Sequence, residues 1–127
     1  MPRWYHPNTL DNGLNVIVNN TTQVHVIKNY ALADSYATVL ANSVGNAALA
    51  GGDKVLGDSA TGRQVTTASK STTVTGDTLV TDDLHIALLD TVNLRVDAVT
   101  DETTDQVLTT GNPLTIPAIN WKSDQPA

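Results

Sequence analysis

The residues best suited to chemistry in this sequence are two carboxylates and an imidazole that lie close together in the chain. They form the pattern Asp82-Asp83-x-His85, and Asp90 stands at the far end of the apolar run that follows. Carboxylate oxygens and imidazole nitrogens both bind divalent cations. On a strand, however, Asp83 and His85 share one face while Asp82 points to the other, so only two ligands converge. We therefore expect Asp82 and Asp83 to form a turn before a strand, with no metal site and no cofactor.

Nucleophilic catalysis would need a serine–histidine–aspartate arrangement built on His25 or His85. The strand-to-helix turn that exposes a hydrolase serine has the pattern Gly-x-Ser-x-Gly, and Gly57-Asp58-Ser59-Ala60-Thr61 lacks its second glycine. His25 alternates with Val24 and Val26, so we interpret it as a strand residue that faces solvent or a partner. Thiol catalysis and cysteine-ligated zinc are excluded because the chain contains no Cys.

Two further patterns point away from catalysis. Gly51-Gly52-Asp53-Lys54 lacks the spacing and the following Ser or Thr of a phosphate-binding loop, and it is typical of a β-turn. Asp101, Glu102 and Asp105 form a polar segment without an aromatic platform for a sugar, which argues against a glycosidase. We therefore predict that the protein is not an enzyme.

The composition indicates which elements must position these residues. The chain has 127 residues, a length that fits one domain, and a net charge of -6. Glu102 is its only Glu, whereas Asp, Asn and Thr are abundant, and this choice of polar residues favours strands joined by turns. The seven Lys and Arg residues are scattered, which argues against nucleic acid as a partner. No run approaches the roughly 18 apolar residues of a membrane span, so no membrane is expected.

The N-terminal part predicts an extended arm followed by a helix. Residues 1–7 carry two aromatic residues and two prolines, and we expect them to form the arm. Residues 8–19 predict one amphipathic helix, because four apolar residues recur at helical spacing: Leu10, Leu14, Ile17 and Val18. Residues 35–41 predict a short second helix, capped by Asp34 or Ser35.

The remaining sequence predicts strands separated by turns. The segment 84–89 is the most apolar run and should be a central strand. Residues 92–99 should be a strand with Val92, Leu94, Val96 and Ala98 on one face. The expected strands are 23–28, 47–50, 63–70, 71–75, 84–89, 92–99, 106–110 and 114–119. Their even spacing predicts a mainly β fold over residues 8–127: a single-domain antiparallel β-sandwich or small β-barrel with one N-terminal amphipathic helix.

Aromatic residues near the two ends of the chain are the candidates for a subunit interface. Trp4, Tyr5 and Trp121 are flanked by polar residues or proline rather than by a core pattern. One interpretation is that these rings close the ends of the core. The other is that they anchor a subunit contact, because aromatic residues are enriched at interfaces.

Five short blocks spread over most of the chain carry a resemblance to a known group of proteins. They are Pro7–Leu14, Ala33–Val39, Gly62–Lys70, His85–Asp90 and Thr110–Asn112. In these blocks the sequence is similar to small tailed-bacteriophage virion structural proteins of the capsid decoration, or cement, kind. That group has no catalytic residues to carry over to this chain.

The resemblance implies a structural component of a tailed bacteriophage particle. Its most direct form is a capsid decoration protein that stabilises the head through contacts with the major capsid protein, commonly as a homotrimer. The protein would be made in the host cytoplasm and reside on the capsid surface of the virion. The arm at residues 1–7 is a candidate to reach a neighbouring subunit. The alternatives are a neck, tail or tail-fibre component, or a carbohydrate-binding β-sandwich module.

Overall fold

The computed structural model describes residues 7–102 and 106–124. Three antiparallel sheets and an N-terminal helix make up most of this part of the chain, which confirms the predicted mainly β fold. The sheets do not close into a barrel within the described residues, so the sandwich alternative fits. Apart from Pro7, which begins the first helix, the predicted arm lies outside the described residues.

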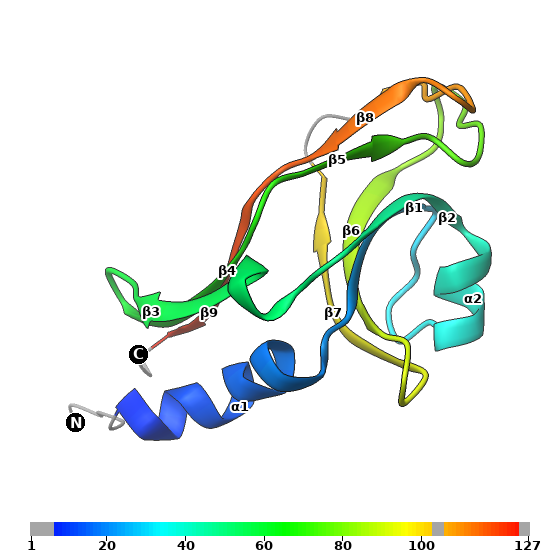
Figure 1. Cartoon of the computed structure of the whole chain (residues 1–127). Helices are drawn as coiled ribbons and strands as arrows, with labels where there is room; N and C mark the ends of the chain where they lie inside the picture. Colours follow the sequence, from blue (N-terminus) through cyan, green and yellow to red (C-terminus); the bar gives the residue numbers. More distant parts are fainter. Residues whose placement is uncertain (1–6, 103–105, 125–127) are drawn as a thin grey trace.

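The helices and strands follow one another as shown in Figure 1. They are α1 (Pro7–Asn20), β1 (Gln23–Lys28), α2 (Tyr36–Ala41), β2 (Ser43–Ala48), the 3-10 turn η1 (Gly51–Asp53), β3 (Lys54–Asp58), β4 (Gly62–Thr67), β5 (Lys70–Thr73), β6 (Leu84–Asp90), β7 (Arg95–Asp101), β8 (Pro113–Ile116) and β9 (Ile119–Asp124). The helix predicted at 8–19 is therefore confirmed as α1. The predicted cap is confirmed as well, because the Ser35 hydroxyl accepts a hydrogen bond from the Thr38 backbone N–H.

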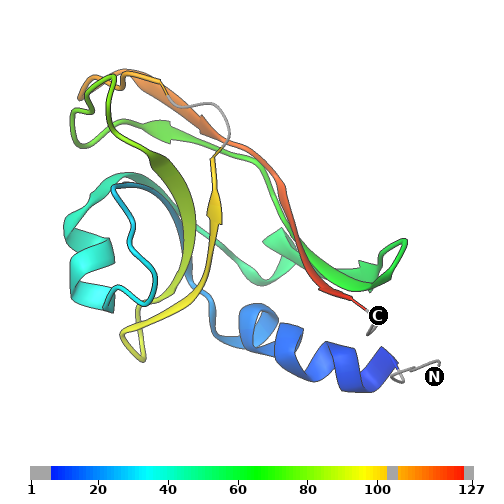
Figure 2. The same ribbon diagram turned by 180° about the vertical axis from the view of Figure 1, so that it is seen from behind.

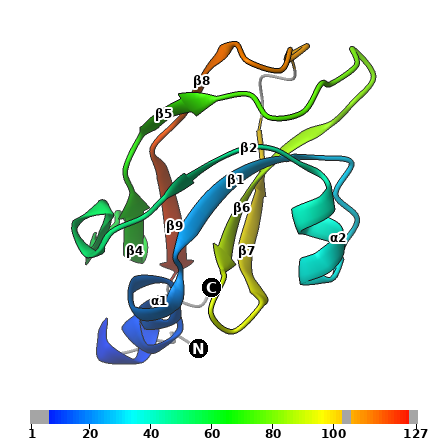
Figure 3. The ribbon, with the colours of Figure 1, turned by 45° about the vertical axis from the view of Figure 1, so that its right-hand side comes forward.

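A four-stranded antiparallel sheet in the order β2-β1-β6-β7 forms one layer, and we call it the main sheet. Its strand β6 lies between β1 and β7 and is the predicted central strand. Leu84, Ile86 and Leu88 pack into the larger apolar core, whereas Ala87 and Leu89 pack into a smaller one under α2. Because β6 is buried on both faces, it needs a nearly continuous apolar sequence. Figure 3 shows α2 on one side of the main sheet and β4 and β9 on the other.

The second layer is a long two-stranded ribbon that bends over the main sheet (Figures 1 and 2), and β3 adds a third strand beside β4 at one end. One strand of the ribbon runs through β4 and β5, and the other runs through β8 and β9. Gly62 pairs with Asp124 at one end and Thr73 with Pro113 at the other, and the register between them never shifts. The ladder is interrupted only around Pro117, which has no N–H to donate.

Helix α1 closes the open end of the two layers. Its buried residues Leu14 and Ile17 belong to the larger core, together with Val65 and Trp121 of the ribbon. A bidentate ion pair fixes the same helix, because the Arg63 guanidinium donates to both carboxylate oxygens of Asp11, and the distance from Nε to Oδ1 is 2.7 Å. Asp11, Leu14 and Ile17 follow one another at helical spacing and therefore lie on one face of α1. This face packs against the ribbon.

The strand prediction is wrong in several places. Residues 91–94 form a turn and β7 begins at Arg95, so Val92 and Leu94 lie outside the strand and are exposed. Residues 106–110 form no ladder, because the Leu108 N–H donates to the Thr78 side chain instead. The strand β3 is absent from the expected strands, yet it pairs with β4 along its whole length.

Candidate functional site

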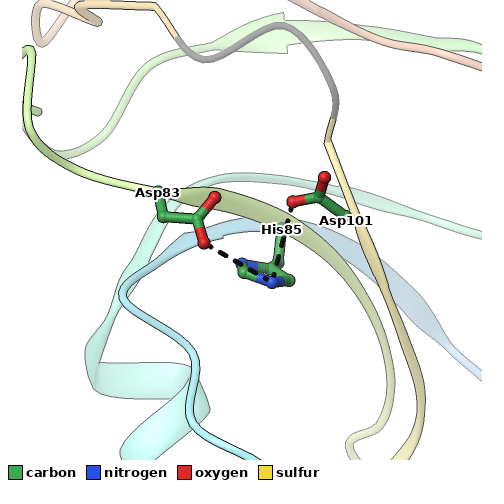
Figure 4. Close-up of side chains that lie close together, drawn as sticks. All are labelled: Asp83, His85 and Asp101. Carbon is green, nitrogen blue, oxygen red and sulfur yellow. Dashed lines mark ion pairs between the residues drawn. The ribbon is translucent and has the colours of Figure 1, made fainter.

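Asp83, His85 and Asp101 come together at one end of the main sheet (Figure 4). One possible ligand atom from each residue lies within 4.8 Å of the others. The His85 Nε2 lies 4.0 Å from Asp83 Oδ2 and 3.8 Å from Asp101 Oδ1. Both distances exceed the range of a hydrogen bond, so these groups are close without being bonded to one another.

Strand pairing explains why these three residues meet. His85 on β6 is the direct cross-strand partner of Asp101 on β7, and side chains of paired residues stand on the same face. Asp83 lies two residues before His85 in extended backbone, so its side chain points to the same face. The His85 ring also contacts Tyr30, with ring centroids 5.5 Å apart and tilted by 52°. Two neighbouring strands and one loop thus position the group.

The surroundings of the three side chains differ. The His85 side chain is 15% exposed, whereas those of Asp83 and Asp101 are 60% and 61% exposed. The His85 Nδ1 is buried and has no hydrogen-bond partner among the described residues. The group therefore combines a mostly buried imidazole with two solvated carboxylates, and this arrangement can hold a cation from the solvent side. It offers no nucleophile.

The other two carboxylates of the predicted pattern serve turns. Asp82 accepts hydrogen bonds from the Leu79 backbone N–H and the Asn29 amide, and these bonds lower its pKa. Asp90 is buried and accepts from the Asn93 backbone N–H and side-chain amide, which lower the pKa of Asp90. The expected turn before β6 is therefore confirmed for Asp82. The expectation that only two ligating groups would converge is wrong, because it left out Asp101.

His25 is buried, and the interpretation that it faces solvent or a partner is wrong. Its ring is 2% exposed and lies between two polar side chains: Nδ1 is 2.7 Å from Ser43 Oγ, and Nε2 is 2.8 Å from Gln23 Oε1. The Gln23 oxygen can only accept, so Nε2 carries the proton and Nδ1 accepts from the Ser43 hydroxyl. Burial lowers the pKa of His25 to about 4.

Of the three interface candidates, the structure places only Trp121. Its side chain is 9% exposed in the larger core, and its indole N–H donates to Thr67 Oγ1 at 3.1 Å. This is the position of a core residue, and it leaves little of the ring for a neighbouring subunit. Trp4 and Tyr5 lie outside the described residues. A subunit contact through these aromatic residues stays a prediction.

A second surface feature lies where two loops meet, beyond the ends of β5 and β8 (Figure 1). Leu79, Val80 and Val107 are 68%, 83% and 58% exposed, and we call these three residues the tip patch. The loops are joined because Thr78 N–H donates to the Leu108 carbonyl at 3.0 Å and Leu108 N–H donates to Thr78 Oγ1 at 2.7 Å. Sequence reasoning missed the patch because it expected residues 106–110 to be a strand.

No pocket is found in the described part of the chain. Within the same residues, neither α-helix is long and apolar enough to cross a bilayer. Comparison with protein-family models, with curated proteins and with solved structures found no significant match.

Proposed function

We propose that this protein is a structural component of a tailed bacteriophage particle, and specifically a capsid decoration protein that binds the major capsid protein. The proposal starts from the resemblance of five sequence blocks to such proteins. The tip patch is the structural observation that supports it. The tip patch would dock on the major capsid protein, and the apolar area buried between this chain and the major capsid protein would stabilise the head.

The tip patch has the chemistry of a docking surface. Three exposed aliphatic side chains stand on two loops that hydrogen bonds join, and exposed apolar surface marks interaction sites on soluble proteins. Valine and leucine also lose less side-chain entropy on burial than Lys or Glu. Contact through this patch therefore loses little conformational freedom.

Hydrogen bonds hold the two loops in place before any partner arrives. The carboxylate of Asp77 accepts from both the backbone N–H and the hydroxyl of Thr110, each at 2.8 Å. Thr78 adds the paired bonds to Leu108. A surface that is already ordered in the free protein binds more tightly than one that must be ordered on contact.

The first test is the position of the chain in the particle. Phage particles whose genome carries this gene are purified, their proteins are identified by mass spectrometry, and the chain is located by cryo-electron microscopy. We expect it on the outer surface of the head, in contact with the major capsid protein. Absence from the particle contradicts the proposal. A position at the neck or tail supports the corresponding alternative, and binding on a glycan array without particle association supports a carbohydrate-binding module.

The second test asks whether the tip patch makes the contact. Val80→Asp and the control Leu32→Asp each put one charge on an exposed apolar position, and Leu32 lies on a different loop and is 93% exposed. We expect Val80→Asp to weaken binding to undecorated heads by about tenfold or more and Leu32→Asp to leave it unchanged. Equal binding by the two variants would remove the tip patch from the interface.

A further inference from the structure

We propose that Asp83, His85 and Asp101 bind one divalent transition-metal ion of the Zn²⁺ class. The site would be open to solvent, with one imidazole and two carboxylate ligands from the protein and water in the remaining position. This inference does not depend on a role in a phage particle, because it rests only on the geometry of the main sheet.

The distances between the three possible ligand atoms are only slightly longer than those in a zinc site. Zinc binds nitrogen and carboxylate oxygen at about 2.0–2.2 Å, which places tetrahedral ligand atoms roughly 3.4 Å apart. His85 Nε2 lies 3.8 Å from the Asp101 oxygen and 4.0 Å from the Asp83 oxygen. Both carboxylates are on exposed side chains that can rotate, so closing the gap requires no movement of the strands. His85 itself is held by its contact with Tyr30.

The hydrogen bonding of His85 is a second observation that points to a ligand. Nδ1 is buried without a partner among the described residues, and the nearest recorded acceptors of Nε2 lie beyond hydrogen-bond distance. The two carboxylates at Nε2 are near enough to share an ion with that nitrogen and too far away to accept a hydrogen bond from it. His25, the other histidine on this face, has a close partner for each ring nitrogen. A metal ion between the carboxylates would give Nε2 a direct partner, whereas the buried Nδ1 would keep the proton.

Charge favours a cation at the same place. Within the described chain, the ion pairs recorded for Asp83 and Asp101 are with His85 alone, and no Lys or Arg is paired with either carboxylate. A divalent ion between them relieves the repulsion of the two negative charges. The imidazole ligand favours zinc and its neighbours over calcium and magnesium, which prefer oxygen ligands.

The strength of the site follows from the same contacts. A metal on Nε2 leaves the proton on Nδ1, where no described acceptor is available, and this unpaired donor opposes binding. Three protein ligands also bind less tightly than the four of a closed structural zinc site. We therefore expect a micromolar dissociation constant. The ion would join β6 to β7 at the base of the loops that carry the tip patch.

Isothermal titration calorimetry with ZnCl₂ tests the proposal on the full chain, after chelator treatment and removal of the chelator. The variants Asp83→Asn and Asp101→Asn keep the size of each side chain and remove one ligand charge. The control Asp58→Asn removes the same charge at a side chain that is 86% exposed on β3. We expect one site in the wild type, binding weakened about tenfold or more in the first two variants, and little change in the control.

A spectroscopic measurement assigns the ligand. Long-range ¹H–¹⁵N spectra of the imidazole rings should show a Zn²⁺-dependent shift of the His85 nitrogens and none for His25. Absence of saturable Zn²⁺ binding by the wild type would overturn the proposal. The same holds if both asparagine variants, shown to be folded by circular dichroism, bind as tightly as Asp58→Asn, or if the His85 resonances do not move.

Discussion

His25 and His85 occupy neighbouring strands of the main sheet in similar local sequences, Val24-His25-Val26 and Leu84-His85-Ile86. Both face the side of the sheet that α2 covers, because His25 pairs with Ala87 and Ile27 pairs with His85. One ring is nevertheless buried between two polar partners, and the other lies at a half-open edge beside two carboxylates. The alternation of apolar and polar residues predicts the face of the sheet on which a side chain lies. How deeply that side chain is buried depends on the elements packed against that face.

The buried His25 makes stability depend on pH. Its pKa is about 4 in the folded protein and near 6.5 in the unfolded chain, so the unfolded chain binds more protons between these values. The free energy of unfolding should be highest above pH 6.5 and should fall by about 3 kcal/mol as the pH drops to 4. Urea unfolding at several pH values measures this change.

A variant separates His25 from the carboxylates that also favour neutral pH. Asp53, Asp77, Asp82 and Asp90 have pKa values lowered below 3.8 by hydrogen bonds, so their contribution is lost only at more acidic pH. His25→Phe is expected to flatten the pH dependence between 4.5 and 6.5. NMR titration of the His25 ring with a midpoint near 6.5 would contradict the buried state.

Trp121 distinguishes a core residue from a subunit anchor. The ring is 9% exposed and hydrogen-bonded to Thr67, so Trp121→Ala should lower the free energy of unfolding by about 3–5 kcal/mol. Val55→Ala on β3 of the same sheet, where the side chain is 58% exposed, should change it by less than about 0.5 kcal/mol. Chemical denaturation of both variants gives the comparison. A Trp121→Ala protein of normal stability that no longer self-associates would favour the anchor.

The residues of the candidate site show how far sequence reasoning reaches. The pairing of Asp83 with His85 on one face could be predicted, since it follows from the alternation of a strand. Asp101 could not be included, because its proximity depends on the register of β7 against β6. That register is set by the turn at residues 91–94, where Leu94 has φ 55 and Asp90 accepts the backbone N–H groups of Val92 and Asn93. A register shift between Leu88 and Leu89 then moves the pairing by one residue and brings Asp101 opposite His85. The sequence pattern had placed this turn inside a strand.

At the scale of elements, the strongest sequence signals gave the most accurate predictions. The helix α1 and the strands β1 and β6 have long or clearly alternating apolar patterns, and the structure places them within a few residues of the prediction. The pattern at residues 114–119 predicted one strand, but Pro117 divides it into β8 and β9. The strand β3 carries only a short apolar piece, and its ladder with β4 gives it a strand conformation. Tertiary pairing therefore decides the weak segments.

Close packing between β2 and the ribbon gives a prediction at this scale. A Cβ atom added at Gly45 would overlap Leu114 Cδ2, which belongs to the larger core. Gly45→Ala should therefore lower the free energy of unfolding by about 1–3 kcal/mol through overpacking. Gly57→Ala is the matched control, because Gly57 also lies in a strand and its added Cβ meets nothing within 4 Å. The control should be neutral or stabilise by up to about 1 kcal/mol. Equal losses in both variants would contradict close packing at Gly45.

The whole molecule depends on contacts between segments far apart in the chain. The ribbon pairs residues 62–73 with 113–124, and α1 is fixed to it by Asp11 and Arg63. Neither layer can bury its apolar face without the other, so we expect one cooperative unfolding transition. Differential scanning calorimetry should show a single peak, with an enthalpy of about 90 kcal/mol near 60 °C and a van't Hoff enthalpy that equals it. Two resolved peaks would contradict a single domain over residues 8–127.

The unbroken register of the ribbon also gives the molecule a polarity. The start of α1 and the end of β9 lie at one end, where Gly62 pairs with Asp124, and the tip patch lies at the other (Figures 1 and 2). A passenger protein fused before α1 or after β9 would therefore begin on the side away from the tip patch. If the tip patch docks as proposed, such a passenger would point away from the surface to which the protein binds.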